Sequence, residues 1–89
     1  MTVIVIDDNP EVRALTVRIL AKAGYKTQSG GTAAAALEFA RTVRDIALIV
    51  LDIHMPGATG FDALQILKSD RILKDIPVLM LSATVDVDK

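Results

Sequence analysis

Three segments of the chain are almost entirely apolar: 2–6 and 46–51, which are rich in β-branched residues, and 77–81. Apolar and polar residues do not alternate within them, which is typical of strands that are covered on both faces of a parallel sheet. Each segment ends abruptly at polar or small residues. Residues 25–29 are more polar and predict a weaker strand at an edge of the sheet.

Segments with helical periodicity separate the apolar runs. They predict helices over residues 10–23, 31–43 and 61–73, and the third could break near Ser69 and Asp70. The predicted order of elements is therefore β-α-β-α-β-α-β.

This order predicts an α/β fold with an open parallel sheet. Right-handed helical crossovers between parallel strands place helices on both faces of such a sheet. No two predicted strands are joined by a hairpin turn, so separate α and β layers fit poorly. The chain contains no linker and no internal repeat, and we expect residues 1–89 to form one domain.

The first helix has clear signals at both ends and one predicted apolar face. Asp8 or Asn9 suits its N-cap, and Gly24 suits the left-handed position after its last turn. It is expected to pack on the sheet through the side chains that share that face, Val12, Leu15, Ile19 and Ala23, with Thr16 and Leu20 flanking it.

Composition excludes several classes of protein. Apolar residues make up 52% of the 89 residues and mean hydropathy is +0.44, which excludes disorder. Ten basic and eleven acidic side chains give a net charge of −1, so there is no electrostatic footprint for nucleic acid or an anionic membrane. There is no cysteine, no apolar run long enough to span a bilayer and no signal-peptide pattern. These features are expected of a cytoplasmic globular domain.

The candidate chemistry lies in the aspartates that follow the apolar runs, Asp7, Asp8 and Asp52. Ligands bind at this edge of an open α/β sheet. If the first and third strands are neighbours, they lie ~4.8 Å apart and the three carboxylates converge. Like charges this close are unfavourable, so either one carboxyl stays protonated or a cation neutralises the group. Oxygen ligands favour Mg²⁺, and Asp52 could then attack a phosphoryl group to form an acyl phosphate.

Each aspartate also has an ordinary alternative role. An aspartate after a strand is commonly a helix N-cap, and Asp8 could be only that. The three together, at corresponding edges of one sheet, favour the functional interpretation.

Two neighbouring features extend this candidate site. Residues 52–60 form a loop with one proline and two glycines, which can offer amides to an anion and a carbonyl to a metal. Ser82 ends the last strand at the same edge, where its hydroxyl can donate to a phosphoryl oxygen, although alone it would be an ordinary strand-end cap. His54 is the only histidine and has no second histidine or cysteine with which to bind zinc.

The chain resembles the receiver domain of bacterial response regulators in two-component signalling. Four blocks match that family in order and together cover essentially the whole chain: residues 4–9 with Val12 and Arg13, 20–25, 48–57 with Gly60 and Phe61, and 76–83. The resemblance implies a doubly wound, flavodoxin-like receiver fold with strand order 2-1-3-4.

The resemblance also implies a role for each candidate residue. Asp52 matches the aspartate that accepts a phosphoryl group from a phosphohistidine. Asp8 and Asp52 resemble the side-chain ligands of Mg²⁺, with the backbone carbonyl of His54 as a third ligand, and Asp7 matches the neighbour that holds the metal through water. Ser82 matches the residue that hydrogen-bonds the phosphoryl group and couples it to a conformational switch.

The implied function is that of a phosphoacceptor module in a phosphorelay. Its partner would be a sensor histidine kinase or a phosphotransfer protein, and it would be a self-phosphorylating signalling domain rather than a turnover enzyme. The alternative is a receiver-like interaction or dimerisation module without phosphotransfer. An aspartate-nucleophile phosphohydrolase is disfavoured, because that class has Asp-x-Asp where this chain has Asp7, Asp8 and Asn9.

The sequence departs from the family at its C-terminal end. The family closes with a fifth strand, which carries a phosphoryl-binding lysine, and a last helix, whereas this sequence ends at Lys89. We therefore expect a C-terminally truncated receiver domain without the fifth strand and last helix. Residues 78–81 would then be an open apolar edge. That edge could support a homodimer, and strand exchange with another chain is the alternative to truncation.

Overall fold

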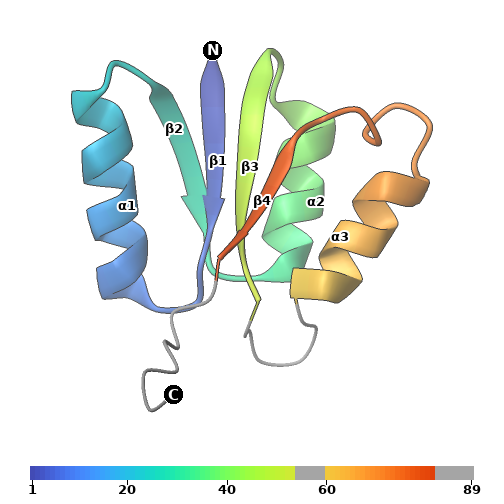
Figure 1. Ribbon diagram of the computed structural model, residues 1–89, viewed down its shortest axis with the longest axis horizontal. Helices are drawn as coiled ribbons and strands as arrows, with labels where there is room; N and C mark the ends of the chain where they lie inside the picture. The colour runs from blue at the N-terminus through green and yellow to red at the C-terminus, as the bar shows by residue number, and fades with distance from the viewer. Residues whose placement is uncertain (54–59, 82–89) are drawn as a thin grey trace, which may run out of the picture.

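The computed structural model describes residues 1–53 and 60–81, which form four strands and three helices (Figure 1). The elements are β1 (Thr2–Ile6), α1 (Pro10–Lys22), β2 (Lys26–Gly30), α2 (Ala33–Thr42), β3 (Ile46–Asp52), α3 (Gly60–Ser69) and β4 (Val78–Leu81).

All four strands are parallel, in the order β2-β1-β3-β4. The expected α/β sheet with strand order 2-1-3-4 is confirmed, and β2 occupies an edge as its polarity predicted. β2 spans 26–30 rather than 25–29, a shift of one residue. The arrowheads in Figure 1 point the same way, so the carboxyl ends of the strands meet at one edge.

The helices cover both faces of the sheet, as expected for a doubly wound fold. Alternate residues of β1 point to opposite faces, because side chains alternate along a strand. Ile4 and Ile6 pack with buried residues of α2 and α3 on one face, while Val3 and Val5 pack with α1 on the other. Within the part of the chain that is described, no helix is long and apolar enough to cross a membrane.

The face through which α1 packs differs from the prediction. Leu20, expected to flank the packing face, and Val17 contact the sheet, whereas Leu15 and Ile19 are 54% and 60% exposed. Apolar residues occur on several sides of this helix, so the spacing of apolar residues alone predicted the wrong packing face. The predicted helix ends are better supported: Asn9 is the N-cap, and Gly24 has a φ of 96°.

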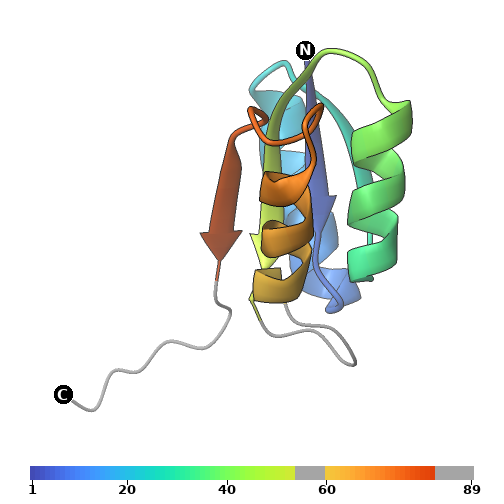
Figure 2. The ribbon, with the colours of Figure 1, turned by 90° about the vertical axis from the view of Figure 1, so that its right-hand side faces the viewer.

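β4 is covered on one face and open on the other, contrary to the expectation of a strand buried on both. Val78 and Met80 pack against the α2/α3 core, whereas Leu79 and Leu81 are 48% and 42% exposed. An apolar run predicts burial on both faces only where a second layer covers the strand. Figure 2 shows β4 at the outer end of the sheet.

The third helix ends at Ser69, at the break that the sequence suggested, rather than at residue 73. Asp70 Oδ1 accepts hydrogen bonds from the amides of Ile72, at 2.8 Å, and Leu73, at 3.1 Å, and so stabilises a turn. Lys68 Nζ donates to the carbonyls of Lys74 and Ile76 across this turn. Leu73, within this turn, is buried, whereas the neighbouring Ile72 is 85% exposed.

Candidate functional site

The three candidate aspartates converge at the carboxyl edge of the sheet. Ile6 pairs with Leu51, so the residues after β1 and at the end of β3 are brought side by side. Carboxylate oxygens of Asp7, Asp8 and Asp52 all lie within 4.8 Å of one another. Asp52 is 4% exposed and Asp7 9%, whereas Asp8 is exposed to solvent. The site is thus an acidic cluster, called the acidic pocket below, in which Asp8 is the member open to solvent.

The turn that carries Asp7 and Asp8 is held by three hydrogen bonds to different elements. The amide of Asp7 donates to the carbonyl of Gly30 at 3.0 Å, which continues the β1–β2 pairing. Asp7 Oδ1 accepts from the amide of Asn9 at 2.9 Å. The carbonyl of Asp7 accepts from Arg13 Nη1 at 2.8 Å. The turn is therefore anchored to β2, to itself and to α1.

The alternative role of Asp8 as the helix cap is not observed. Asn9 Oδ1 accepts from the amides of Glu11, at 2.9 Å, and Val12, at 3.2 Å, and so satisfies the first turn of α1. Asp8 faces the acidic pocket from the residue before this cap.

The electrostatics of the cluster favour a bound cation. Two ionised carboxylates 4.8 Å apart repel each other by roughly 3 kcal/mol at an effective dielectric constant near 20, and by less where Asp8 meets solvent. Three such groups therefore oppose one another unless a proton or a cation compensates them. An all-oxygen donor set with an open side fits Mg²⁺, which prefers a few carboxylates and keeps several waters.

Two candidate residues lie outside the described residues: His54, with its backbone carbonyl, and Ser82. Their assignment stays a prediction from the sequence.

Arg13 and Gly31 are neighbours of the site for which the sequence assigned no role. Arg13 lies four and seven positions before Val17 and Leu20, the residues that turn α1 toward the sheet. A charged residue on the sheet-facing side of a helix is the signal that could have identified it. It was missed because α1 was expected to pack through Leu15 and Ile19.

Comparison with protein families places the site in context. The family model described as "Response regulator receiver domain" matches residues 3–89. Two-component response regulator ORR6 of rice is 34% identical over 85 residues, which cover 93% of this chain and 50% of that protein. DNA-binding response regulator MtrA of Mycolicibacterium smegmatis is 31% identical over 84 residues, 94% of this chain and 35% of its own. The chain thus spans half the length of the first relative and less of the second.

Solved structures of similar proteins share the fold. The N-terminal domain of a response regulator receiver protein from Methanoculleus marisnigri superposes with a TM-score of 0.88 at 32% identity, covering 98% of this chain and 70% of that one. Chemotaxis protein CheY4 of Vibrio cholerae gives a TM-score of 0.86 at 28% identity, covering 96% of this chain and 70% of that one.

The strand order, the acidic pocket at the carboxyl edge and the match over residues 3–89 agree. This chain belongs to the response regulator receiver domain family.

Proposed function

We propose that this chain is the phosphoacceptor module of a two-component phosphorelay, with residues 1–89 acting as one receiver unit and Asp52 as the acceptor. The observation that carries the proposal is the convergence of Asp52 with Asp7 and Asp8 within 4.8 Å. Asp52 stands at the end of β3, where the strand backbone fixes its position. Receiver domains are signalling modules rather than turnover enzymes, and the proposal follows that general role.

The chemistry is a transfer of one phosphoryl group. A carboxylate oxygen of Asp52 attacks phosphorus, the new P–O bond forms as the P–N bond of a phosphohistidine breaks, and the imidazole leaves with the electron pair. The product is an acyl phosphate on Asp52. The donor would be a sensor histidine kinase or a phosphotransfer protein in the cytoplasm.

The surrounding residues would prepare this reaction. Asp8 and Asp52 would hold Mg²⁺ directly, Asp7 through water, and the His54 backbone carbonyl would complete the protein ligands. When bound, Mg²⁺ neutralises the carboxylates and the charge on phosphoryl oxygens. Ser82 would donate a hydrogen bond to the phosphoryl group and pass its presence to a partner surface. With a net charge of −1, the domain itself would not bind nucleic acid.

Incubation with Mg²⁺ and acetyl phosphate, followed by intact mass measurement, tests the proposal. We expect a weak phosphate adduct on the wild-type chain, because no residue of this sequence matches the family's phosphoryl-binding lysine, and none on Asp52→Asn. Asp45→Asn changes an exposed carboxylate at the opposite end of β3 and should leave the adduct unchanged. An adduct that survives Asp52→Asn, or no adduct on any variant, would contradict it.

The exposed face of β4 favours a second candidate, an interaction or dimerisation module without phosphotransfer. Leu79 and Leu81 present an apolar surface at the outer strand of the described sheet. Titration with Mg²⁺ separates the two candidates. Binding that is lost in Asp8→Ala supports the phosphoacceptor, and absence of binding supports the interaction module.

A further inference from the structure

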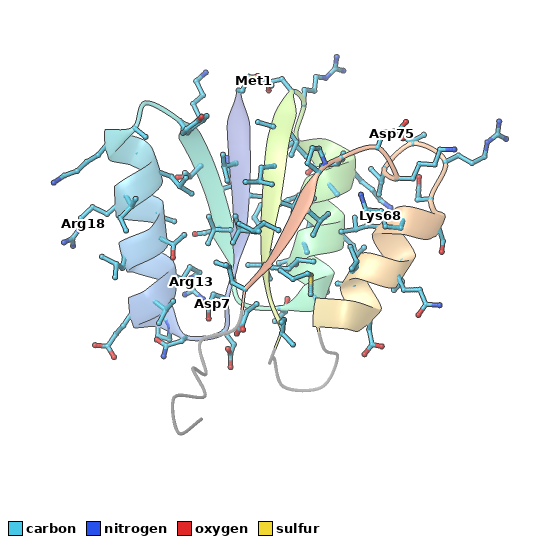
Figure 3. All side chains as sticks on the ribbon, viewed as in Figure 1. Met1, Asp7, Arg13, Arg18, Lys68 and Asp75 are labelled. Atoms are coloured by element: carbon cyan, nitrogen blue, oxygen red, sulfur yellow. The ribbon has the colours of Figure 1, made fainter. Side chains whose placement is uncertain are left out.

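Arg13 connects the acidic pocket to the first helix. Along α1, Arg13 shares a face with Val17 and Leu20, which pack on the sheet. Arg13 lies one helical turn closer than Val17 to the carboxyl edge of the sheet, where Asp7 follows β1. Figure 3 shows Arg13 beside Asp7, whereas Arg18 points away from the sheet. The guanidinium is thus held against the peptide between Asp7 and Asp8.

The backbone of the β2–α2 turn leaves room for this guanidinium. A Cβ added at Gly31 would lie 2.9 Å from Arg13 Nη1, 3.7 Å from the carbonyl oxygen of Asp7 and 3.8 Å from the Cα of Asp8. No left-handed φ demands glycine at Gly31. The missing side chain therefore serves the approach of Arg13, not the conformation of the turn.

We propose that Arg13 is a positioning residue for the metal site, and that the absence of a side chain at Gly31 makes room for its guanidinium. This role rests on the proposed function. The Arg13 Nη1 bond of 2.8 Å ends on the carbonyl of the peptide that joins Asp7 to Asp8. The amide and carboxylate of Asp7 are already held by Gly30 and Asn9. Arg13 adds the restraint on the peptide carbonyl, and so fixes the orientation in which Asp8 leaves the turn.

Positioning and charge make opposite predictions for Mg²⁺ binding. A guanidinium bonded to the peptide that carries two of the carboxylates repels an incoming cation, so its removal through charge alone would tighten Mg²⁺ binding. A residue that orients metal ligands has the reverse effect, because loss of such support weakens metal affinity. Gly31→Ala separates the two effects: it keeps the charge of Arg13 but displaces the flexible end of its side chain.

The test is calorimetric titration of Mg²⁺ into the chain and four variants. We expect Arg13→Gln and Gly31→Ala each to raise the dissociation constant about tenfold. Arg13→Lys should fall between these variants and wild type, since an ammonium can reach the carbonyl without the planar fork. Arg18→Gln, an exposed change on the same helix, should stay within about twofold of wild type.

Two further measurements separate positioning from a loss of folding. The melting temperature without Mg²⁺ should be similar in all variants. The Mg²⁺ concentration that gives half-maximal phosphorylation by acetyl phosphate should rise in Arg13→Gln and Gly31→Ala, while the rate at saturating Mg²⁺ stays close to wild type.

Several results would overturn the proposal. Unchanged or tighter Mg²⁺ binding in Arg13→Gln would show that charge, not position, dominates. Wild-type affinity in Gly31→Ala would show that the place of the guanidinium does not matter. If the wild-type chain binds no Mg²⁺, the proposed function itself is contradicted, and the role of Arg13 falls with it. That result is distinguishable because it needs no variant.

Discussion

At the scale of single residues, the three clustered carboxylates repel one another unless a proton or a cation compensates their charge. Asp8 is the exposed member of the group, and Asn9 rather than Asp8 caps α1. Among the described residues, the Asp8 carboxylate makes no hydrogen bond, whereas Asp7 and Asp52 each have a partner, so Asp8 can be neutralised without removing a hydrogen bond from this part of the fold. Because Asp8 contributes charge to the cluster without capping α1, it is the best position at which to measure the repulsion.

Asp8→Asn should stabilise the metal-free chain and abolish its response to Mg²⁺. Removal of one of three neighbouring negative charges relieves repulsion, and we expect the melting temperature without Mg²⁺ to rise by a few degrees. The increase that Mg²⁺ produces in the wild-type chain should disappear. Thermal unfolding followed by circular dichroism measures both. A lower metal-free melting temperature would mean that the carboxylate is structurally required.

The sequence predicted that the three aspartates converge, but it did not predict the contacts of Arg13 and Gly31 with the turn that carries two of them. Asp7, Asp8 and Asp52 could be found because each follows a strand end, and parallel strands end at one edge. The contact of Arg13 with Asp7 could not be found, because it depends on which face of α1 meets the sheet. The position of Gly31 could not be recognised either, because it matters only where the β2–α2 turn meets Arg13 of α1, and these segments lie far apart in the sequence.

At the scale of elements, the two faces of the sheet are packed unequally. Among the residues that the structure describes, the α2/α3 face contains nine buried ones, including Ala63 and Leu67, whereas α1 contributes no fully buried residue. Alanines on α2 and α3 allow these helices to approach the sheet closely, so larger side chains of β1 and β3 fill the space between. Most of the hydrophobic stabilisation therefore comes from this side.

Leu67→Ala should destabilise the chain severely. Leu67 is fully buried, and a buried leucine truncated to alanine costs about 2–5 kcal/mol of unfolding free energy. Its neighbour Ile66 is 46% exposed, so Ile66→Ala is a matched control that should cost less than about 1 kcal/mol. Urea denaturation followed by circular dichroism gives both values. Equal losses for the two variants would contradict the assigned orientation of α3.

Element-scale prediction was most accurate where local signals agree. β1 and β3 are continuous apolar runs that end at aspartates, and the predicted bounds match within one residue. The segment after Ser69 was harder, because its turn depends on the side chain of Asp70 competing with the helix for the next amides. The packing face of α1 was wrong because several of its sides are apolar.

At the scale of the whole molecule, the described sheet has two different edges. β2 presents mostly exposed polar residues, whereas β4 presents Leu79 and Leu81 on its open face. A polar edge strand resists pairing with another chain, and an apolar one promotes it. Self-association of this chain should therefore involve β4 rather than β2.

Leu79→Lys should reduce that association without unfolding the chain. Leu79 lies on the open face of β4, so the new charge meets solvent in the monomer and would be buried or repelled in an assembly. Analytical ultracentrifugation over a range of concentrations should show a shift toward monomer. Gln28→Lys, on exposed β2, is the control and should leave association unchanged. Association that persists in Leu79→Lys would place the contact elsewhere.

The adjacency of β1 and β3 has a consequence for how the chain acquires its structure. These strands pair although α1, β2 and α2 all lie between them in the sequence. Their pairing closes a long loop, and such non-local contacts slow folding. The acidic pocket therefore cannot assemble until the central pair of strands has formed. During synthesis, the mutual repulsion of its carboxylates would arise only late, after the apolar strands that overcome it are already paired.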